Sequence, residues 1–194
     1  MKTEHAPTIQ RADYRPLAWT VETVDLHFRL DPEATLVTNR MCCVRNRDAA
    51  DGPIRLWSEA LERVSLSVDG QAPQALREDG GVIEIDAAGD RVVVEVVTRV
   101  NPRANTTLSG LYLSNGGFFT QCEAEGFRRI TCFPDRPDVM ARYTVTLEAD
   151  REACPVLLSN GNLVDAGLLP GGRHYAKWED PFRKPSYLFA LVAA

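Results

Sequence analysis

Strict alternation of apolar and polar residues is the feature that most restricts the fold of this chain. Residues 24–30 and 143–149 place apolar side chains at every second position. The same period of two recurs at residues 64–68 and 174–178. Successive side chains of a β-strand point to opposite faces of the sheet, so this pattern predicts strands with one buried face.

Two further segments predict strands of a different kind. Residues 92–97 are apolar and mostly β-branched apart from Glu95, which favours a more central strand. Residues 187–192 predict a final apolar strand. Turn sequences separate the predicted strands, at residues 31–32, 51–53, 69–70, 79–81, 115–117, 160–162 and 170–172.

Helical periodicity is almost absent. The one candidate is residues 135–140, where Asp135 could cap a helix and Pro137 could occupy its first turn. Many short strands with frequent turns are typical of an antiparallel sandwich. We therefore predict an all-β fold, an antiparallel β-sandwich with at most short helical turns.

The length of the chain fits one domain. At 194 residues it can bury a core that needs neither a metal nor disulfides for stability. We expect residues 1–13 to be a flexible amino terminus and residues 14–194 to be a single β-sandwich domain. Only two alanines follow the apolar segment 187–192, and we take this as a sign that the chain was cut from something longer.

Charge and cysteine content exclude several partners and suggest a location. The net charge of −5 would repel phosphate groups, so we expect neither a nucleic-acid nor a membrane partner. The five cysteines include one adjacent pair and no CxxC, which favours free thiols in a reducing compartment. The first residues lead into no apolar stretch typical of a signal peptide. We therefore predict a cytoplasmic protein.

The sequence contains no recognisable catalytic set. We interpret His5, His27 and His174 as lone surface or strand residues rather than metal ligands. The sequence contains no HExxH, nucleophile elbow, P-loop or GxGxxG. From the residues alone, we expect no catalytic residue in this chain and no metal bound by it.

The segment 118–140 departs from ordinary strand and turn sequences. If it is extended, Gln121, Glu123 and Glu125 share one face, and Cys122 and Ala124 share the other. Such a polar row can be a hydrated sheet face. It can also be a cluster of acceptors for a cationic group.

At these residues the chain resembles the bacterial aminopeptidase N family, zinc-dependent alanyl aminopeptidases of the gluzincin class. The likeness runs in one register from about Tyr14 to the last residue. It is carried by TQCEAEGFR at residues 120–128, DRPDV at 135–139, NTTLSGLY at 105–112, LLSNGN at 157–162, WEDPFRKP at 178–185 and YLFALVA at 187–193.

The resemblance implies a saddle-like amino-terminal domain that precedes a catalytic domain. The family's zinc helix lies beyond the last residue here, so zinc would belong to the full-length parent and not to this piece. In the family, the acid of the QxE stretch binds the free amino group of the peptide substrate. The matching residue is Glu123, and Gln121 is similarly placed.

The same resemblance implies minor roles for other residues. Asp135, Arg136 and Asp138 are expected to form a structural turn and an ion pair. Ser186 stands where relatives commonly have cysteine, and we assign it no role. Without its catalytic domain, the chain is expected to hydrolyse nothing and to expose an apolar surface through which it self-associates.

The alternative function is a free-standing β-sandwich that binds a ligand or protein without chemistry. It explains the lack of histidines and catalytic motifs equally well. It does not explain the long agreement with the peptidase family.

Overall fold

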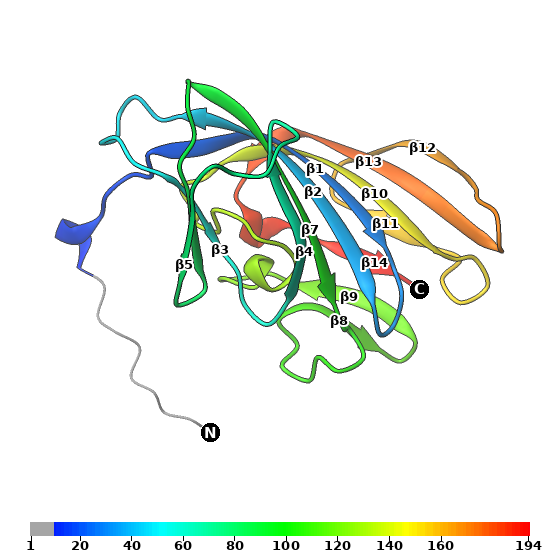
Figure 1. The fold of residues 1–194 in the computed structure, drawn as a ribbon. Helices are drawn as coiled ribbons and strands as arrows, with labels where there is room; N and C mark the ends of the chain where they lie inside the picture. Colours follow the sequence, from blue (N-terminus) through cyan, green and yellow to red (C-terminus); the bar gives the residue numbers. More distant parts are fainter. Residues whose placement is uncertain (1–9) are drawn as a thin grey trace.

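The longest alternating segments form one seven-stranded sheet (Figure 1). The structure is a computed structural model, and it describes residues 10–194. In spatial order the strands are β12 (Asn162–Leu168), β13 (Arg173–Lys184), β10 (Ala141–Asp150), β1 (Trp19–Arg29), β2 (Thr35–Arg45), β7 (Arg91–Val100) and β4 (Glu62–Val68). All neighbours are antiparallel except β1 and β10, which run parallel, with Val24 beside Tyr143.

Two smaller sheets complete the fold. The four-stranded sheet has the order β11 (Leu157–Ser159), β14 (Leu191–Ala193), β9 (Gly117–Gln121) and β8 (Gly110–Ser114). The three-stranded sheet has the order β3 (Ile54–Trp57), β6 (Val82–Ile85) and β5 (Leu76–Asp79). Single 3₁₀ turns are η1 (Arg11–Asp13), η2 (Phe127–Arg129) and η3 (Ser186–Leu188).

The core lies against the inner face of the large sheet. Phe28 of β1 stacks on Phe189 with ring centroids 5.8 Å apart. Phe127 of η2 meets Phe133 at 4.9 Å and Phe189 at 5.3 Å, in edge-to-face geometry. Tyr143 of β10 closes this aromatic cluster. The prediction of an all-β sandwich is confirmed, with one parallel pair inside an otherwise antiparallel sheet.

Two local predictions are wrong. Residues 135–140 form no helix, because the Asp135 carboxylate binds Arg128 and Ser186 instead of capping a following turn. Residues 187–192 are not one strand: η3 occupies the start, and β14 begins only at Leu191. The carbonyls of Pro185 and Ser186 accept turn bonds from Leu188 and Phe189, so this backbone is not free for sheet pairing.

The predicted flexible terminus at residues 1–13 lies mostly outside the described residues. The part that is described, residues 10–13, contains the turn η1. Within residues 10–194 no helix is both long and apolar enough to cross a membrane.

Candidate functional site

The candidate site begins where β9 ends. Gln121 is the last residue of that strand and pairs with Gly110 of β8. A turn follows, in which the Gly126 amide donates to the Cys122 carbonyl at 2.8 Å, and η2 comes next. The acidic segment is therefore a turn held between β9 and η2, so the condition of an extended strand is not met beyond Gln121.

This geometry corrects part of the predicted alternation. Gln121, Glu123 and Glu125 are exposed and Cys122 is buried, as predicted. Ala124 was expected to point inward, but it is exposed because strand pairing has already ended at Gln121. The peptide bond between Glu123 and Ala124 is cis.

Cys122 belongs to the core and not to the polar surface. Burial, with a smaller contribution from the Asp135 carboxylate, raises the pKa of its thiol well above the ordinary value. A protonated, enclosed thiol is a poor nucleophile and a poor metal ligand. Its side chain anchors the start of the turn.

The carboxylates of this segment differ in their partners. Glu125 pairs with Arg128 at 3.2 Å, and Asp135 pairs with Arg128 at 3.1 Å. Glu123 pairs with no basic side chain in residues 10–194. The Gln121 side-chain amide donates to the Glu123 backbone carbonyl at 3.2 Å, which leaves both Glu123 carboxylate oxygens and the Gln121 amide oxygen as acceptors.

A buried polar network lies directly behind this turn. The Asp135 side chain is 1% exposed and that of Arg128 is 14% exposed. The Ser186 hydroxyl donates to the second Asp135 oxygen at 2.5 Å. Sequence reasoning placed Asp135 with Arg136 and Asp138 in a structural turn with an ion pair, and it gave Ser186 no role. Arg128 and Asp135 lie seven positions apart, and that spacing alone does not identify a pair.

An ion pair is present among the residues where the sequence analysis expected one. Arg136 donates to both oxygens of Asp138, at 2.9 and 2.7 Å, over a turn at residues 137–138. This confirms the predicted ion pair at the surface of the segment.

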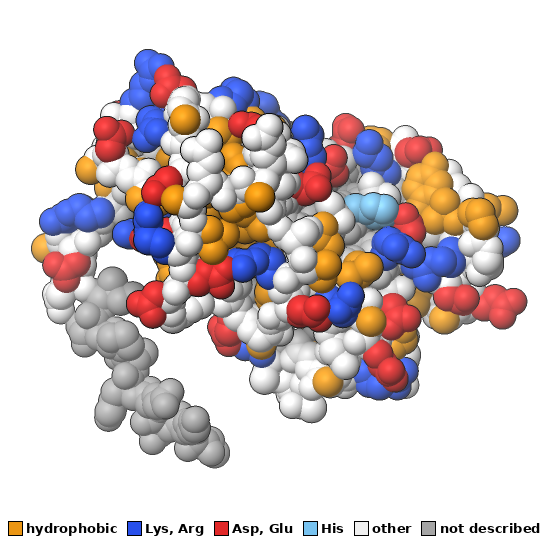
Figure 2. Space-filling model, viewed as in Figure 1, with side chains coloured by type: hydrophobic (Ala, Val, Ile, Leu, Met, Phe, Trp, Pro, Cys, Tyr) orange, Lys and Arg blue, Asp and Glu red, His pale blue; other side chains and the backbone are white. Residues whose placement is uncertain are grey.

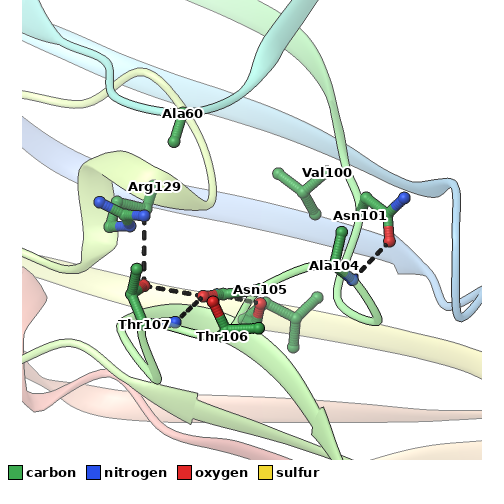
Figure 3. Close-up of a pocket in the computed structure, with 9 residues that line it drawn as sticks. Ala60, Val100, Asn101, Ala104, Asn105, Thr106, Thr107 and Arg129 are labelled. Carbon is green, nitrogen blue, oxygen red and sulfur yellow. Dashed lines mark hydrogen bonds between the residues drawn. The ribbon is translucent and has the colours of Figure 1, made fainter.

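A pocket of about 210 Å³ adjoins the site (Figure 3). Arg129 lines it and donates to the Thr107 hydroxyl at 3.2 Å and to the Glu59 carboxylate. Thr107 in turn donates to Asn105 at 2.8 Å. Arg129 is thus fixed in the pocket wall by a neutral and an acidic partner.

The histidines form no cluster in the described part of the chain. His27 lies 2.5 Å from Glu148, and His174 lies 2.7 Å from the Cys154 carbonyl. His5 lies outside the described residues. Among residues 10–194, no group of three or more His, Cys, Asp and Glu side chains is placed to hold a metal ion. The side chains of residues 10–194 therefore do not fit a zinc ion.

Comparisons with known proteins agree on one family. A profile described as Peptidase M1 N-terminal domain matches residues 81–188. Proteins named aminopeptidase N from Caulobacter vibrioides and Escherichia coli are 48% and 44% identical to this chain. The matches cover 100% and 98% of this chain but only 22% of each relative.

Solved structures share the fold. Legionella pneumophila aminopeptidase A, in complex with aspartic acid, superposes with a TM-score of 0.87 at 34% identity, over 94% of this chain and 22% of that one. An M1 zinc metallopeptidase from Deinococcus radiodurans, bound to a Tyr-Ser-Ala substrate, gives 0.77 at 15% identity, over 91% and 42%, and shows the fold alone. Sequence and fold together establish that this chain belongs to the peptidase M1 N-terminal domain family.

Proposed function

We propose that this domain is the substrate-anchoring part of a zinc-dependent aminopeptidase that removes amino-terminal residues from peptides. Its relatives are named aminopeptidases, and the chain spans about a fifth of their length. The catalytic zinc would be held by the remainder of the parent protein. That remainder contains the catalytic domain, which is the partner of this domain. The chain alone would bind no zinc tightly and hydrolyse nothing.

The anchor is the carboxylate of Glu123, with Gln121 beside it. The observation that carries this proposal is the contrast between neighbouring acids: Arg128 pairs with Glu125 and Asp135, while Glu123 is exposed without a basic partner among residues 10–194. A free carboxylate next to an amide oxygen can accept hydrogen bonds from all three protons of an ammonium group.

An exopeptidase must measure from the end of its substrate. A carboxylate that requires an ammonium group does this, because only the first residue of a peptide carries a free α-amine. Fixing that amine places the first peptide bond at the reacting centre and lowers the entropic cost of reaching the transition state. The role of Glu123 is therefore to orient the substrate.

The proposal also covers the binding partner, the cellular location and the self-association of the chain. The partner molecule is a peptide with a free amino terminus, not a nucleic acid or a membrane. All five cysteines are free, which supports a cytoplasmic location.

The β12–β13 hairpin carries apolar side chains that nothing in residues 10–194 covers, so the isolated chain would self-associate there.

The test is a charge-removing variant in the full-length parent. Glu123→Gln keeps the size of the side chain and removes its charge. Losing a desolvated charge pair costs about 2–5 kcal/mol, so kcat/KM for alanine p-nitroanilide should fall by roughly 30-fold or more. The matched control is Glu152→Gln, because Glu152 is an exposed carboxylate in a distant turn.

Two results would overturn the proposal. One is a Glu123→Gln enzyme whose kinetics match those of Glu152→Gln. The other is clear turnover of alanine p-nitroanilide, with bound zinc, by the purified 194-residue chain.

A further inference from the structure

The turn that carries Glu123 is attached to a buried carboxylate on another segment. Asp135 Oδ2 accepts the backbone N–H of Arg128 and its Nε–H, both at 3.1 Å. The Asp135 carbonyl accepts from Arg128 Nη2 at 2.9 Å. Three bonds therefore join Arg128, in the 3₁₀ turn η2 that follows the acidic turn, to a single aspartate.

Asp135 itself is held rigidly. Its Oδ1 accepts the Ser186 hydroxyl at 2.5 Å, and its side chain is almost fully enclosed. Just before it, Phe133 and Trp57 exchange backbone bonds of 2.8 and 3.1 Å, which tie this segment to β3. The Arg128 guanidinium also lies over the Trp57 ring, 5.8 Å from its centroid. Asp135 thus links the acidic turn to β3 and η3.

Further contacts restrict the turn at its start and at its end. Gln121 is paired with β8, and a Cβ on Gly126 would lie 3.1 Å from the Gly110 nitrogen. Glu125 adds a second contact to Arg128 at 3.2 Å. Between these two attachments the chain has only residues 122–127 in which to place the Glu123 carboxylate.

We propose that Asp135 is a positioning residue: through Arg128 it holds the turn of residues 122–126 so that Gln121 and Glu123 face the incoming amine. This inference rests on the function proposed above. Asp135 itself touches no substrate, because its side chain is enclosed and both its oxygens are already occupied by Arg128 and Ser186. Its effect is transmitted through backbone placement.

The first test measures the turn directly in the 194-residue chain. Asp135→Asn keeps the shape of the side chain and removes the charge that holds Arg128. Hydrogen exchange of the Gly126 and Arg128 amides should become at least tenfold faster, while exchange in β2 stays as in the wild type. Asp138→Asn is the matched control, because it removes a surface partner of Arg136 and should leave both regions unchanged.

The second test uses the full-length parent and alanine p-nitroanilide. A misplaced anchor weakens recognition of the amine, so Asp135→Asn should lower kcat/KM by about 10- to 100-fold, mainly through KM. A purely structural role would instead reduce the fraction of active enzyme and so lower kcat at unchanged KM. Ser186→Ala, which removes one bond to Asp135, should give a smaller change in the same direction.

The outcomes separate the two proposals. If Glu123→Gln raises KM and Asp135→Asn does not, the positioning role is wrong and the anchor stands. If Glu123→Gln leaves kcat/KM unchanged, the proposed function fails and the positioning role fails with it. Faster exchange throughout the Asp135→Asn domain would also overturn the inference, because it would show general loss of stability.

Discussion

Gly126 and Gln121 are in direct backbone contact: a methyl group on the Cα of Gly126 would overlap the carbonyl oxygen of Gln121. The same methyl would lie 3.0 Å from the Cα of Cys122 and 3.1 Å from the amide nitrogen of Gly110. All three contacts are with backbone atoms, which cannot rotate away. The tight turn that displays Glu123 therefore requires glycine at this position.

Gly126→Ala should accordingly destabilise the domain. Forcing one methyl into a packed backbone contact costs about 1–3 kcal/mol, and urea unfolding measures this as a lower midpoint at unchanged m. The control is Gly52→Ala, where the nearest atom to the new methyl is the Ala18 Cβ at 3.4 Å. That variant should stay within about 0.5 kcal/mol of the wild type. Equal stability of the two variants would contradict the contact.

Buried thiols make the fold sensitive to alkali. Burial raises the pKa of Cys43 to about 12 and of Cys132 to about 11, and it raises that of Cys122 as well. The pKa of a thiol in the unfolded chain is about 8.5. Above that pH the unfolded chain therefore binds fewer protons than the folded chain. The free energy of unfolding should therefore fall as pH rises, by about 1.4 kcal/mol per pH unit for each such thiol.

Two variants test the sign of this dependence. Cys43→Ala removes one of these thiols and should flatten the profile from urea unfolding between pH 8 and 10. Burial lowers the pKa of Lys184, although Asp180 acts in the opposite direction. The folded chain therefore binds fewer protons at this group than the unfolded chain, and its contribution to the free energy of unfolding increases as pH rises. Lys184→Met should therefore steepen the alkaline fall. A flat wild-type profile would contradict the enclosure of the thiols.

Strand β12 should make the isolated chain self-associate. It is the outer strand of the large sheet, with Leu163 53% and Leu168 70% exposed. Figure 2 shows apolar side chains at the end of the molecule where the β12–β13 hairpin lies. An open apolar edge without lysine or proline is poorly protected against pairing with another chain.

Sedimentation velocity at several concentrations tests this. The wild-type chain should sediment faster as concentration rises, and the double variant Leu163→Lys with Leu168→Lys should remain a monomer. Val64→Lys is the control, because Val64 is an exposed apolar residue on the opposite edge, at a register shift that interrupts pairing. A wild-type chain that is monomeric at every concentration would show that the edge does not pair.

The sequence predicted strand β10 because the inward positions of this strand are apolar. In β10, Tyr143, Val145 and Leu147 point inward, and the expected segment matches the structure. Strand β2 went unpredicted because Thr35 and Asn39 occupy two of its inward positions. Asn39 is accommodated by donating to the Thr131 hydroxyl at 3.3 Å, a contact 92 positions away that a local pattern cannot reveal.

The resemblance named Gln121 and Glu123, and their role as an amine anchor stays a prediction. The structure leaves both side chains exposed, Gln121 as the last residue of β9 and Glu123 in the turn that follows it. Asp135 is held by Ser186, which lies in a turn near the other end of the chain. Long-range pairs of this kind follow from topology, and no spacing rule within residues 118–140 encodes them.

The parallel pairing of β1 with β10 also affects when and how fast the domain folds during synthesis. Val24 of β1 can pair with Tyr143 of β10 only after the more than one hundred residues between them have been synthesised. Closing so long a loop costs conformational entropy before the strands form stabilising contacts. We therefore expect folding on the millisecond-to-second timescale of β proteins with many non-local contacts. Until then one edge of β1 has no paired strand, so during synthesis the hairpin of β1 and β2 is exposed to pairing with another chain.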